Sequence, residues 1–146
     1  MKFSETIYIN KPRDVVVYYF ADPNYMGEFQ EGFVRKDTIS GEPLAEGTIS
    51  KLYYKQGKRE MELTETVLSN QLPDTFEANY HHKSIENILR CTFNELDDNS
   101  TEYTWEIHYY RVSGFMVKVM ITLFPGIFKK QARKWLENFK TFVEAQ

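Results

Sequence analysis

The middle of the chain alternates apolar and polar residues with a period of two, which predicts β-strands. The clearest segment is 102–111, whose apolar face consists of Tyr103, Trp105, Ile107 and Tyr109. The same alternation recurs in three further segments, 58–68, 75–83 and 86–96. Short runs of Asp, Asn, Gly and Ser separate them. Successive strands joined by short turns favour an antiparallel sheet with one face in water.

The first third of the chain predicts three more strands and a short helix. We expect the strands at 3–9, 34–40 and 48–55. The segment 12–22 is rich in β-branched residues, but Pro12 at its start and Asp22-Pro23 at its end favour a short helix.

From Gly114 onward the apolar spacing changes from two to 3.6, which predicts a long amphipathic helix. Proline lacks an amide hydrogen and clashes with the preceding turn, so Pro125-Gly126 should kink or interrupt this helix. The apolar stripe consists of Phe115, Met116, Val119, Met120, Leu123, Phe124, Phe128, Ala132, Trp135, Leu136, Phe139, Phe142 and Val143.

Composition adds the suggestion of a cavity. The 146 residues are enough for one domain, and 42% of them are hydrophobic. The chain holds 11 Phe, 10 Tyr and 2 Trp, more aromatic bulk than a tightly packed helical bundle needs. An interior volume lined by rings is one explanation.

Charge and cysteine content exclude other classes. The net charge of −3 has the wrong sign for a general nucleic-acid binder. A single cysteine, Cys91, excludes an internal disulfide, and the N-terminus has no apolar signal stretch. We therefore expect a cytoplasmic protein. The longest uncharged apolar run, 119–128, is shorter than the ~20 residues that a transmembrane helix requires.

This order of elements is that of the α+β helix-grip fold, in which a curved antiparallel sheet of about seven strands wraps around a long C-terminal helix and two short helices follow the first strand. The chain resembles the START-like (SRPBCC) superfamily, which includes polyketide cyclase/dehydrase-like proteins and Bet v 1-type ligand binders. The resemblance covers nearly all of residues 1–146, treated as one domain. It is carried by Ile7-Tyr8-Ile9-Asn10-Lys11-Pro12, Val16, Phe20-Ala21-Asp22-Pro23, Gly47-Thr48, Leu136-Glu137-Asn138-Phe139-Lys140 and Glu144.

The resemblance implies a cavity between sheet and helix that holds an apolar small molecule. It does not imply a reaction, because one fold hosts many functions. The chain departs from the family pattern where many members carry a Trp shortly after the Asp and this chain has Phe29. That difference affects the packing of the second short helix.

Four polar residues are in phase with the apolar strand faces: Glu5, Glu65, His82 and Arg111. Glu65 lies between Leu63 and Val67, so folding must desolvate it or give it a partner. It is a candidate general acid or base, although an ion pair or a water-bridged carboxylate is the favoured interpretation. His82 is the second catalytic candidate, but it lies beside a turn and has no evident partner.

Arg111 ends the strand that holds Trp105 and Tyr109, and in the helix-grip order that strand lies beside the first one. One interpretation is an ion pair between Glu5 and Arg111. The other is a guanidinium that binds a ligand carboxylate at the mouth of the cavity.

The predicted ligand-binding residues combine these polar groups with the apolar faces. Such a stripe can be solid core or cavity wall, and the resemblance favours the wall. The set is Met61, Leu63, Glu65, Phe76, Tyr80, His82, Leu89, Phe93, Trp105, Tyr109, Arg111, Met116, Met120 and Phe124.

No metal or cofactor site is predicted. His81 and His82 are adjacent on a strand and point to opposite faces, His108 belongs to an outer face, and Cys91 is alone. No phosphate-binding loop or nucleophile elbow occurs.

Three functions follow from these observations. The first is non-enzymatic binding or transport of a hydrophobic small molecule, by a monomer or homodimer. The alternative is a polyketide cyclase/dehydratase-like enzyme in which Glu65 or His82 moves a proton. The third is a peripheral membrane, lipid-handling module that uses residues 115–134, although a solvated helix face is favoured for its cationic cluster of Lys129, Lys130, Arg133 and Lys134.

Overall fold

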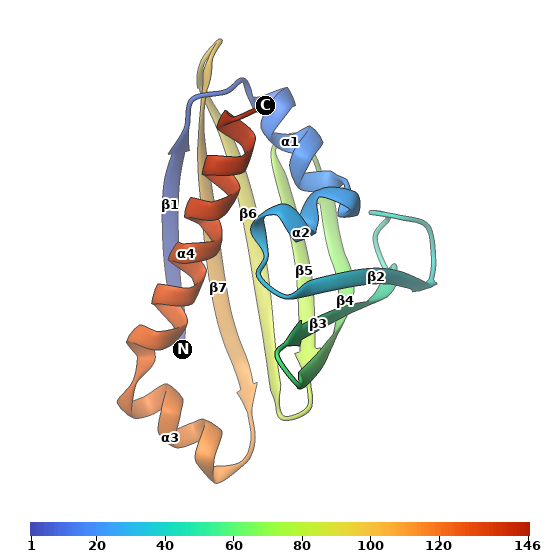
Figure 1. Cartoon of the computed structure of the whole chain (residues 1–146), viewed down its shortest axis with the longest axis vertical. Helices are drawn as coiled ribbons and strands as arrows, with labels where there is room; N and C mark the ends of the chain where they lie inside the picture. Colours follow the sequence, from blue (N-terminus) through green and yellow to red (C-terminus); the bar gives the residue numbers. More distant parts are fainter.

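A seven-stranded antiparallel sheet curves around the C-terminal helix in the computed structural model, which describes residues 1–146 (Figure 1). This is the predicted helix-grip fold. The elements are β1 (Lys2–Ile9), α1 (Arg13–Ala21), the 3₁₀ turn η1 (Pro23–Tyr25), α2 (Met26–Phe29), β2 (Phe33–Ser40), β3 (Ile49–Gln56), β4 (Arg59–Gln71), β5 (Thr75–His82), β6 (Ile85–Asp97), β7 (Ser100–Val112), α3 (Phe115–Leu123) and α4 (Pro125–Glu144).

The strands follow the order β1-β7-β6-β5-β4-β3-β2 across the sheet. Hairpins join neighbours from β2 to β7, as the short turns predicted, while β1 pairs with β7 at one edge. In that pair Lys2 is opposite His108 and Ile9 is opposite Thr101. The first strand therefore lies beside the last strand, and α4 packs against β1 (Figure 1).

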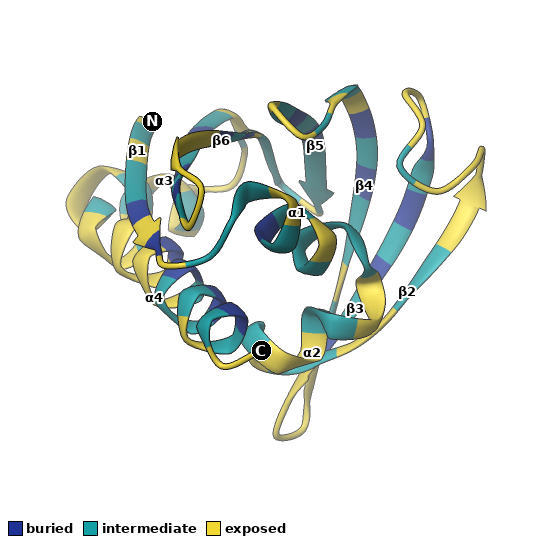
Figure 2. Cartoon of the chain, turned by 90° about the horizontal axis from the view of Figure 1, so that it is seen from above, coloured by how far each residue is buried: buried dark blue, intermediate teal, exposed yellow.

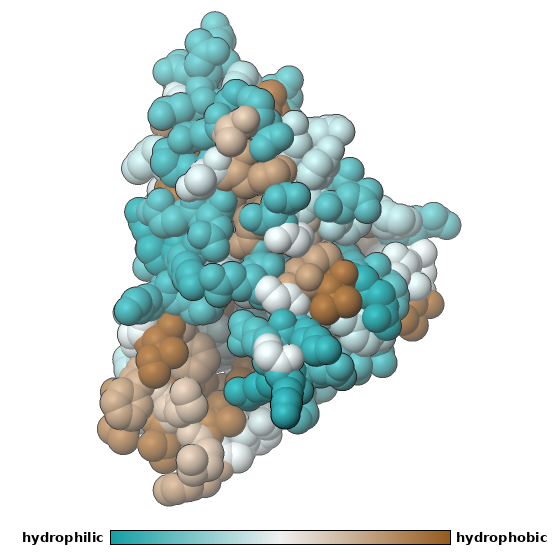
Figure 3. Space-filling view, in the orientation of Figure 1, coloured by the Kyte–Doolittle hydropathy of each residue, from teal (hydrophilic) through white to brown (hydrophobic).

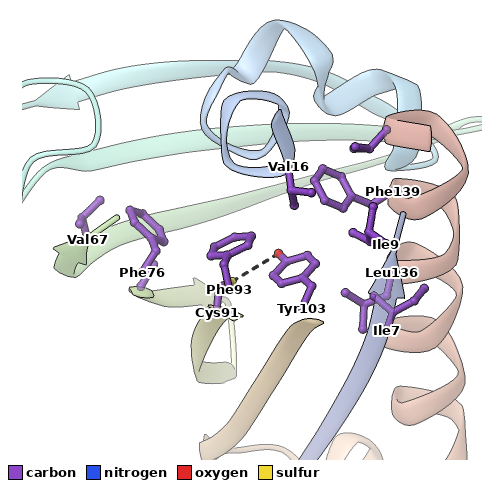
Figure 4. Packing of buried hydrophobic residues seen from close by; sticks show 12 residues of the cluster. Ile7, Ile9, Val16, Val67, Phe76, Cys91, Phe93, Tyr103, Leu136 and Phe139 are labelled. Carbon is purple, nitrogen blue, oxygen red and sulfur yellow. Dashed lines mark hydrogen bonds between the residues drawn. The ribbon is translucent and has the colours of Figure 1, made fainter. Parts of the chain in front are cut away.

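The core lies at the α1 end of the space between sheet and α4, because the inward faces of β6 and β7 are apolar there. Phe93 and Tyr103 stack with ring centroids 4.5 Å apart, and Phe139 of α4 meets Tyr103 edge to face at 5.5 Å (Figure 4). Leu136 and Val143 are fully buried on the same side of α4. These contacts attach the C-terminal helix to the sheet.

The segment predicted as a short helix forms α1, and its Val16 is fully buried. Asp22 accepts a hydrogen bond from the Asn24 amide and so begins η1. Figure 2 shows α1 and α2 between the sheet and α4. Phe29, at the position of the missing Trp, packs edge to face on Phe139 at 4.8 Å, so a smaller ring still joins α2 to α4.

The C-terminal helix is interrupted where Pro125-Gly126 predicted it. Phe124 leaves the helical region, with φ −130° and ψ 52°, and Pro125 begins α4, where its missing amide hydrogen costs nothing. α4 buries Ala132, Leu136, Phe139 and Val143 on the face toward the sheet (Figure 2). α3 has no buried residue. Neither helix is long and apolar enough to cross a membrane.

Candidate functional site

A cavity of about 410 Å³ lies between the concave face of the sheet, α4 and the α1–α2 segment. Of its 29 lining residues, 22 are hydrophobic. This volume is within the range of small-molecule sites, which run from about 300 to 1,000 Å³. The aromatic excess of the sequence is thus arranged partly as core and partly as the wall of this cavity.

Nine of the residues predicted to bind a ligand line the cavity, because alternate positions of β4 to β7 point to its interior. They are Met61, Leu63, Glu65, Phe76, Tyr80, His82, Leu89, Trp105 and Tyr109.

Phe93 does not line the cavity, although it is in phase with residues that do. It is 1% exposed, and the rings of Tyr103 and Phe20 pack against it at 4.5 and 5.0 Å. Phe93 is therefore part of the core. The period-two pattern identifies the face of the strand to which a residue points, but not whether other side chains cover that residue.

Arg111 also lies away from the cavity, because the ladder between β6 and β7 shifts register just before it. Tyr109 is paired with Asn87 and Arg111 with Glu86, so Tyr110 is an extra residue without a partner in the ladder. This bulge reverses the face to which the following residues of β7 point. Arg111 therefore joins Glu86 and His81 on the outer face. Hydrogen bonding by the Arg111 guanidinium lowers the pKa of Glu86 below its ordinary value.

The predicted ion pair between Glu5 and Arg111 is wrong because of the register between β1 and β7. Glu5 is opposite Trp105 in the β1–β7 ladder, well before Arg111. Its carboxylate instead lies 3.6 Å from the guanidinium of Arg133 on α4.

Met116, Met120 and Phe124 lie outside the cavity wall as well. They are 74%, 41% and 55% exposed. The sequence pattern predicted one continuous apolar face over residues 115–143, but the helix breaks at Phe124-Pro125 and α3 buries none of its residues. Only the α4 half of the stripe faces the interior.

The sequence interpretation missed the rest of the wall. Leu52 and Tyr54 occupy the inner face of β3. The period-two alternation of 48–55 could have assigned both residues to the cavity wall. The α4 stripe already contained Phe128, Ala132 and Trp135, but they were not assigned to the site. The other missed residues are Phe20, Ala21, Pro23, Met26, Phe29, Gln30, Lys36, Leu44, Ile85, Asn87, Cys91, Tyr103, Ile107, Gln131 and Phe139.

The most polar part of the wall is a cluster of Glu65, Lys36 and Tyr80. Glu65 Oε1 lies 2.8 Å from Lys36 Nζ, and the Tyr80 hydroxyl donates to Glu65 Oε2 at 2.7 Å. Glu65 and Tyr80 are directly opposite on β4 and β5, whereas Lys36 reaches across from β2. The side chains of Glu65 and Lys36 are 5% and 17% exposed. The ion pair favoured from the sequence is thus confirmed.

Two phenols of the wall are held in their neutral form. Burial raises the pKa of Tyr80 well above its ordinary value, and the negative charge of Glu65 adds to the effect. Burial likewise raises the pKa of Tyr54, whose hydroxyl donates to Gln30 Oε1 at 2.7 Å. Both side chains therefore act as hydrogen-bonding groups, and Glu65 has two partners.

A second polar chain runs along β7 and β6. The Trp105 indole donates to the Tyr103 hydroxyl at 2.6 Å, and that hydroxyl donates to Cys91 Sγ at 3.6 Å (Figure 4). Burial raises the pKa of Cys91 to about 12, so the thiol stays protonated. This part of the wall carries no charge.

His82 lines the cavity near the end of β5, and its Nδ1 lies 3.0 Å from the carbonyl oxygen of Glu62. No hydrogen bond joins His82 to Glu65. The two catalytic candidates thus share one cavity but have separate partners. No group of three or more His, Cys, Asp or Glu side chains is placed to hold a metal ion.

No protein-family model and no curated protein sequence matches this chain. Solved structures do match its fold. The Zhui aromatase/cyclase from Streptomyces sp. R1128 has a TM-score of 0.78 at 10% identity, over 99% of this chain and 93% of its own. The major latex-like protein 151 from Panax ginseng has a TM-score of 0.72 at 14% identity, over 97% and 96%.

A conserved protein from Geobacillus kaustophilus reaches a TM-score of 0.78 at 12% identity, over 98% of this chain and 95% of its own. Identities this low establish the fold alone. The chain therefore has the helix-grip fold of aromatase/cyclases and Bet v 1-like proteins, as its resemblance to the START-like superfamily implied.

Proposed function

We propose that this protein binds a hydrophobic small molecule of lipid, polyketide or aromatic type and encloses it between the sheet and α4. The observation that carries the proposal is the cavity of about 410 Å³ with 22 hydrophobic residues among its 29 lining residues. Transfer of an apolar surface from water into such a wall is favourable by about 25 cal/mol per Å². The protein would carry or sequester its ligand unchanged.

The Glu65 cluster supports a ligand with one polar end. Lys36 and Tyr80 lie beside an otherwise apolar wall, and Glu65 orients both side chains. The Tyr80 hydroxyl donates its one proton to Glu65, whereas the Lys36 ammonium has further N–H groups to donate. A hydroxyl or carbonyl oxygen of the ligand would accept a hydrogen bond from the Lys36 ammonium, while the apolar body of the ligand contacts Leu63, Leu89 and the facing rings. A few placed polar groups in an apolar site fix orientation and specificity.

Native mass spectrometry and thermal shift against a fatty acid, a quinone and an aromatic polyketide test this proposal. The informative variant is Ala132→Leu, because Ala132 lines the cavity and is 6% exposed. The added side chain should fill part of the volume and weaken binding at least tenfold. Ala145→Leu, at an exposed position past α4, makes the same substitution outside the cavity and should leave binding unchanged.

Two results would contradict the proposal: no member of the panel shifts the mass or the melting temperature, or Ala132→Leu binds as well as the parent protein.

The second candidate is a polyketide cyclase/dehydratase-like enzyme acting on a cyclic substrate in the same cavity. Two observations favour it: Glu65 and His82 line one volume, and aromatase/cyclases share the fold. In this mechanism Glu65 or His82 would accept or donate the proton. At least one of Glu65→Gln and His82→Gln should then reduce turnover of a polyketide substrate at least 100-fold while the ligand still binds. Recovery of unchanged substrate from the parent protein, or undiminished turnover in both variants, would exclude it.

A further inference from the structure

α3 and the turn that follows it expose a continuous apolar surface. Single exposed apolar residues are common, but a contiguous group marks an interaction site. Figure 3 shows this surface as the brown region over α3, with hydrophilic surface beginning along α4 beside it. The α3 patch consists of Phe115 (79% exposed), Met116 (74%), Met120 (41%), Leu123 (64%), Phe124 (55%) and Ile127 (53%).

The segment around the α3 patch is cationic, although the chain as a whole has a net charge of −3. No Asp or Glu occurs between Glu106 and Glu137. Arg133 pairs with Glu5 and with Glu137 one turn along α4, and Lys134 pairs with Glu31. Three other lysines of the segment make no ion pair: Lys118, Lys129 and Lys130.

The unpaired lysines border the apolar side chains. Lys118 is one turn from Phe115 on α3, and Lys130 is one turn from Ile127 on α4, spacings that place each pair on one side of a helix. Phe128, between Ile127 and Lys129, lines the cavity and packs on Tyr109 at 5.3 Å. The α3 patch is therefore continuous with one end of the cavity.

We infer that α3 and the first turn of α4 dock on a lipid bilayer that bears anionic headgroups. The apolar side chains of the α3 patch enter the boundary between headgroups and acyl chains, and Lys118, Lys129 and Lys130 contact the headgroups. Nine residues make α3 only about 14 Å long, so the helix lies in the interface and does not span. Docking would turn the end of the cavity next to the α3 patch toward the lipid, so that a ligand could pass between the bilayer and the cavity; this consequence rests on the proposed function.

Charge favours a bilayer over a second copy of this chain. A two-fold contact through the α3 patch would set the same unpaired lysines of each copy near one another, with no acidic residue in the segment to balance them. An anionic membrane supplies the missing negative charge and the apolar layer together.

Cosedimentation with phosphatidylcholine vesicles, with and without phosphatidylserine, tests the inference. The full chain should bind the anionic vesicles, and high salt should weaken that binding. Lys129→Glu/Lys130→Glu should weaken it about 30-fold or more, since each basic residue near an anionic surface contributes about a factor of five. Lys55→Glu/Lys58→Glu, at exposed positions of the β3–β4 hairpin, makes the same charge change and should bind at least tenfold better than the α4 variant.

Insertion is tested separately from adsorption. Met116→Glu/Leu123→Glu should abolish binding while the melting temperature stays unchanged, because both residues are solvent-exposed. Phe115→Trp should give a blue-shifted emission increment only with anionic vesicles.

Absence of vesicle binding, or equal binding by the two lysine variants, would overturn the inference. A third result would also overturn it: the parent protein is a dimer in light scattering and binds no vesicles, and Met116→Glu/Leu123→Glu makes it a monomer. Ligand binding in solution is measured separately, so failure of vesicle binding would not contradict the proposed function, and failure of ligand binding would not contradict membrane docking.

Discussion

Replacing Lys36 by Met removes the cation that balances Glu65 in the cavity wall. Glu65 is 5% exposed, and after the substitution its carboxylate would keep only the Tyr80 hydroxyl, 2.7 Å away. Removing one partner of a buried ion pair typically costs about 3 to 5 kcal/mol. Lys36 itself is 17% exposed, so some water can replace its ammonium. We therefore expect Lys36→Met to lower the free energy of unfolding by about 3 kcal/mol.

Removing both charges should cost much less than removing the cation alone. In Glu65→Gln the amide oxygen still accepts a hydrogen bond from Tyr80, and the ammonium of Lys36, which loses its ion-pair partner, can reach water. The substitution should lower the free energy of unfolding by about 1 to 2 kcal/mol. The double variant Lys36→Met/Glu65→Gln contains no unbalanced charge. The double variant should cost about 1 kcal/mol, which gives a coupling energy of about 3 to 4 kcal/mol between the two sites.

Urea unfolding followed by tryptophan fluorescence measures all four proteins, since Trp105 and Trp135 both lie in the cavity wall. Lys51→Met is the matched control: it breaks the pair between Lys51 and Glu62, 3.3 Å apart with side chains 39% and 53% exposed. Exposed pairs contribute about 0 to 1 kcal/mol. The reasoning is refuted if Lys36→Met is no more destabilising than Lys51→Met, or if the double variant is as unstable as Lys36→Met.

Other consequences concern single residues. A disulfide reagent at about pH 8 should label Cys91 only as fast as the chain unfolds, because the residue is 1% exposed and burial also raises the pKa of its thiol to about 12. Rapid labelling of the folded protein would contradict this burial. Burial raises the pKa of Glu144, but hydrogen bonds from a backbone N–H and the Lys140 ammonium outweigh it and hold that pKa below 4.5. Its contribution to stability is then present above about pH 4.5 and lost as the pH falls through the lowered value, so the difference in unfolding free energy between the parent protein and Glu144→Gln should shrink toward pH 3. A difference independent of pH would exclude the charged interaction. Leu136→Ala should cost about 2 to 5 kcal/mol in urea unfolding, whereas Leu123→Ala, at a 64% exposed position, should change stability by less than about 0.5 kcal/mol; equal losses would contradict the separation of α3 from α4.

The sequence determined which residues share a face and where elements end. Period-two alternation placed Tyr103, Trp105 and Ile107 together because successive side chains of a strand point to opposite faces. Pro125 interrupted the C-terminal helix because proline cannot continue an interior turn. The resemblance to a superfamily added the order in which these elements assemble, and the structure confirms the helix-grip fold.

Only the tertiary structure decided what each face meets. Lys36 and Glu65 are far apart in the chain, and nothing local to Lys36 indicates that β2 will bring it to the cavity. The register shift before Arg111 reverses its face, because one extra residue in a ladder changes the phase of all that follow. The apolar spacing of α3 equals that of a buried helix, yet the sheet covers α4 and leaves α3 exposed. Periodicity is a local property of the chain, whereas burial depends on which distant segment arrives to cover a face.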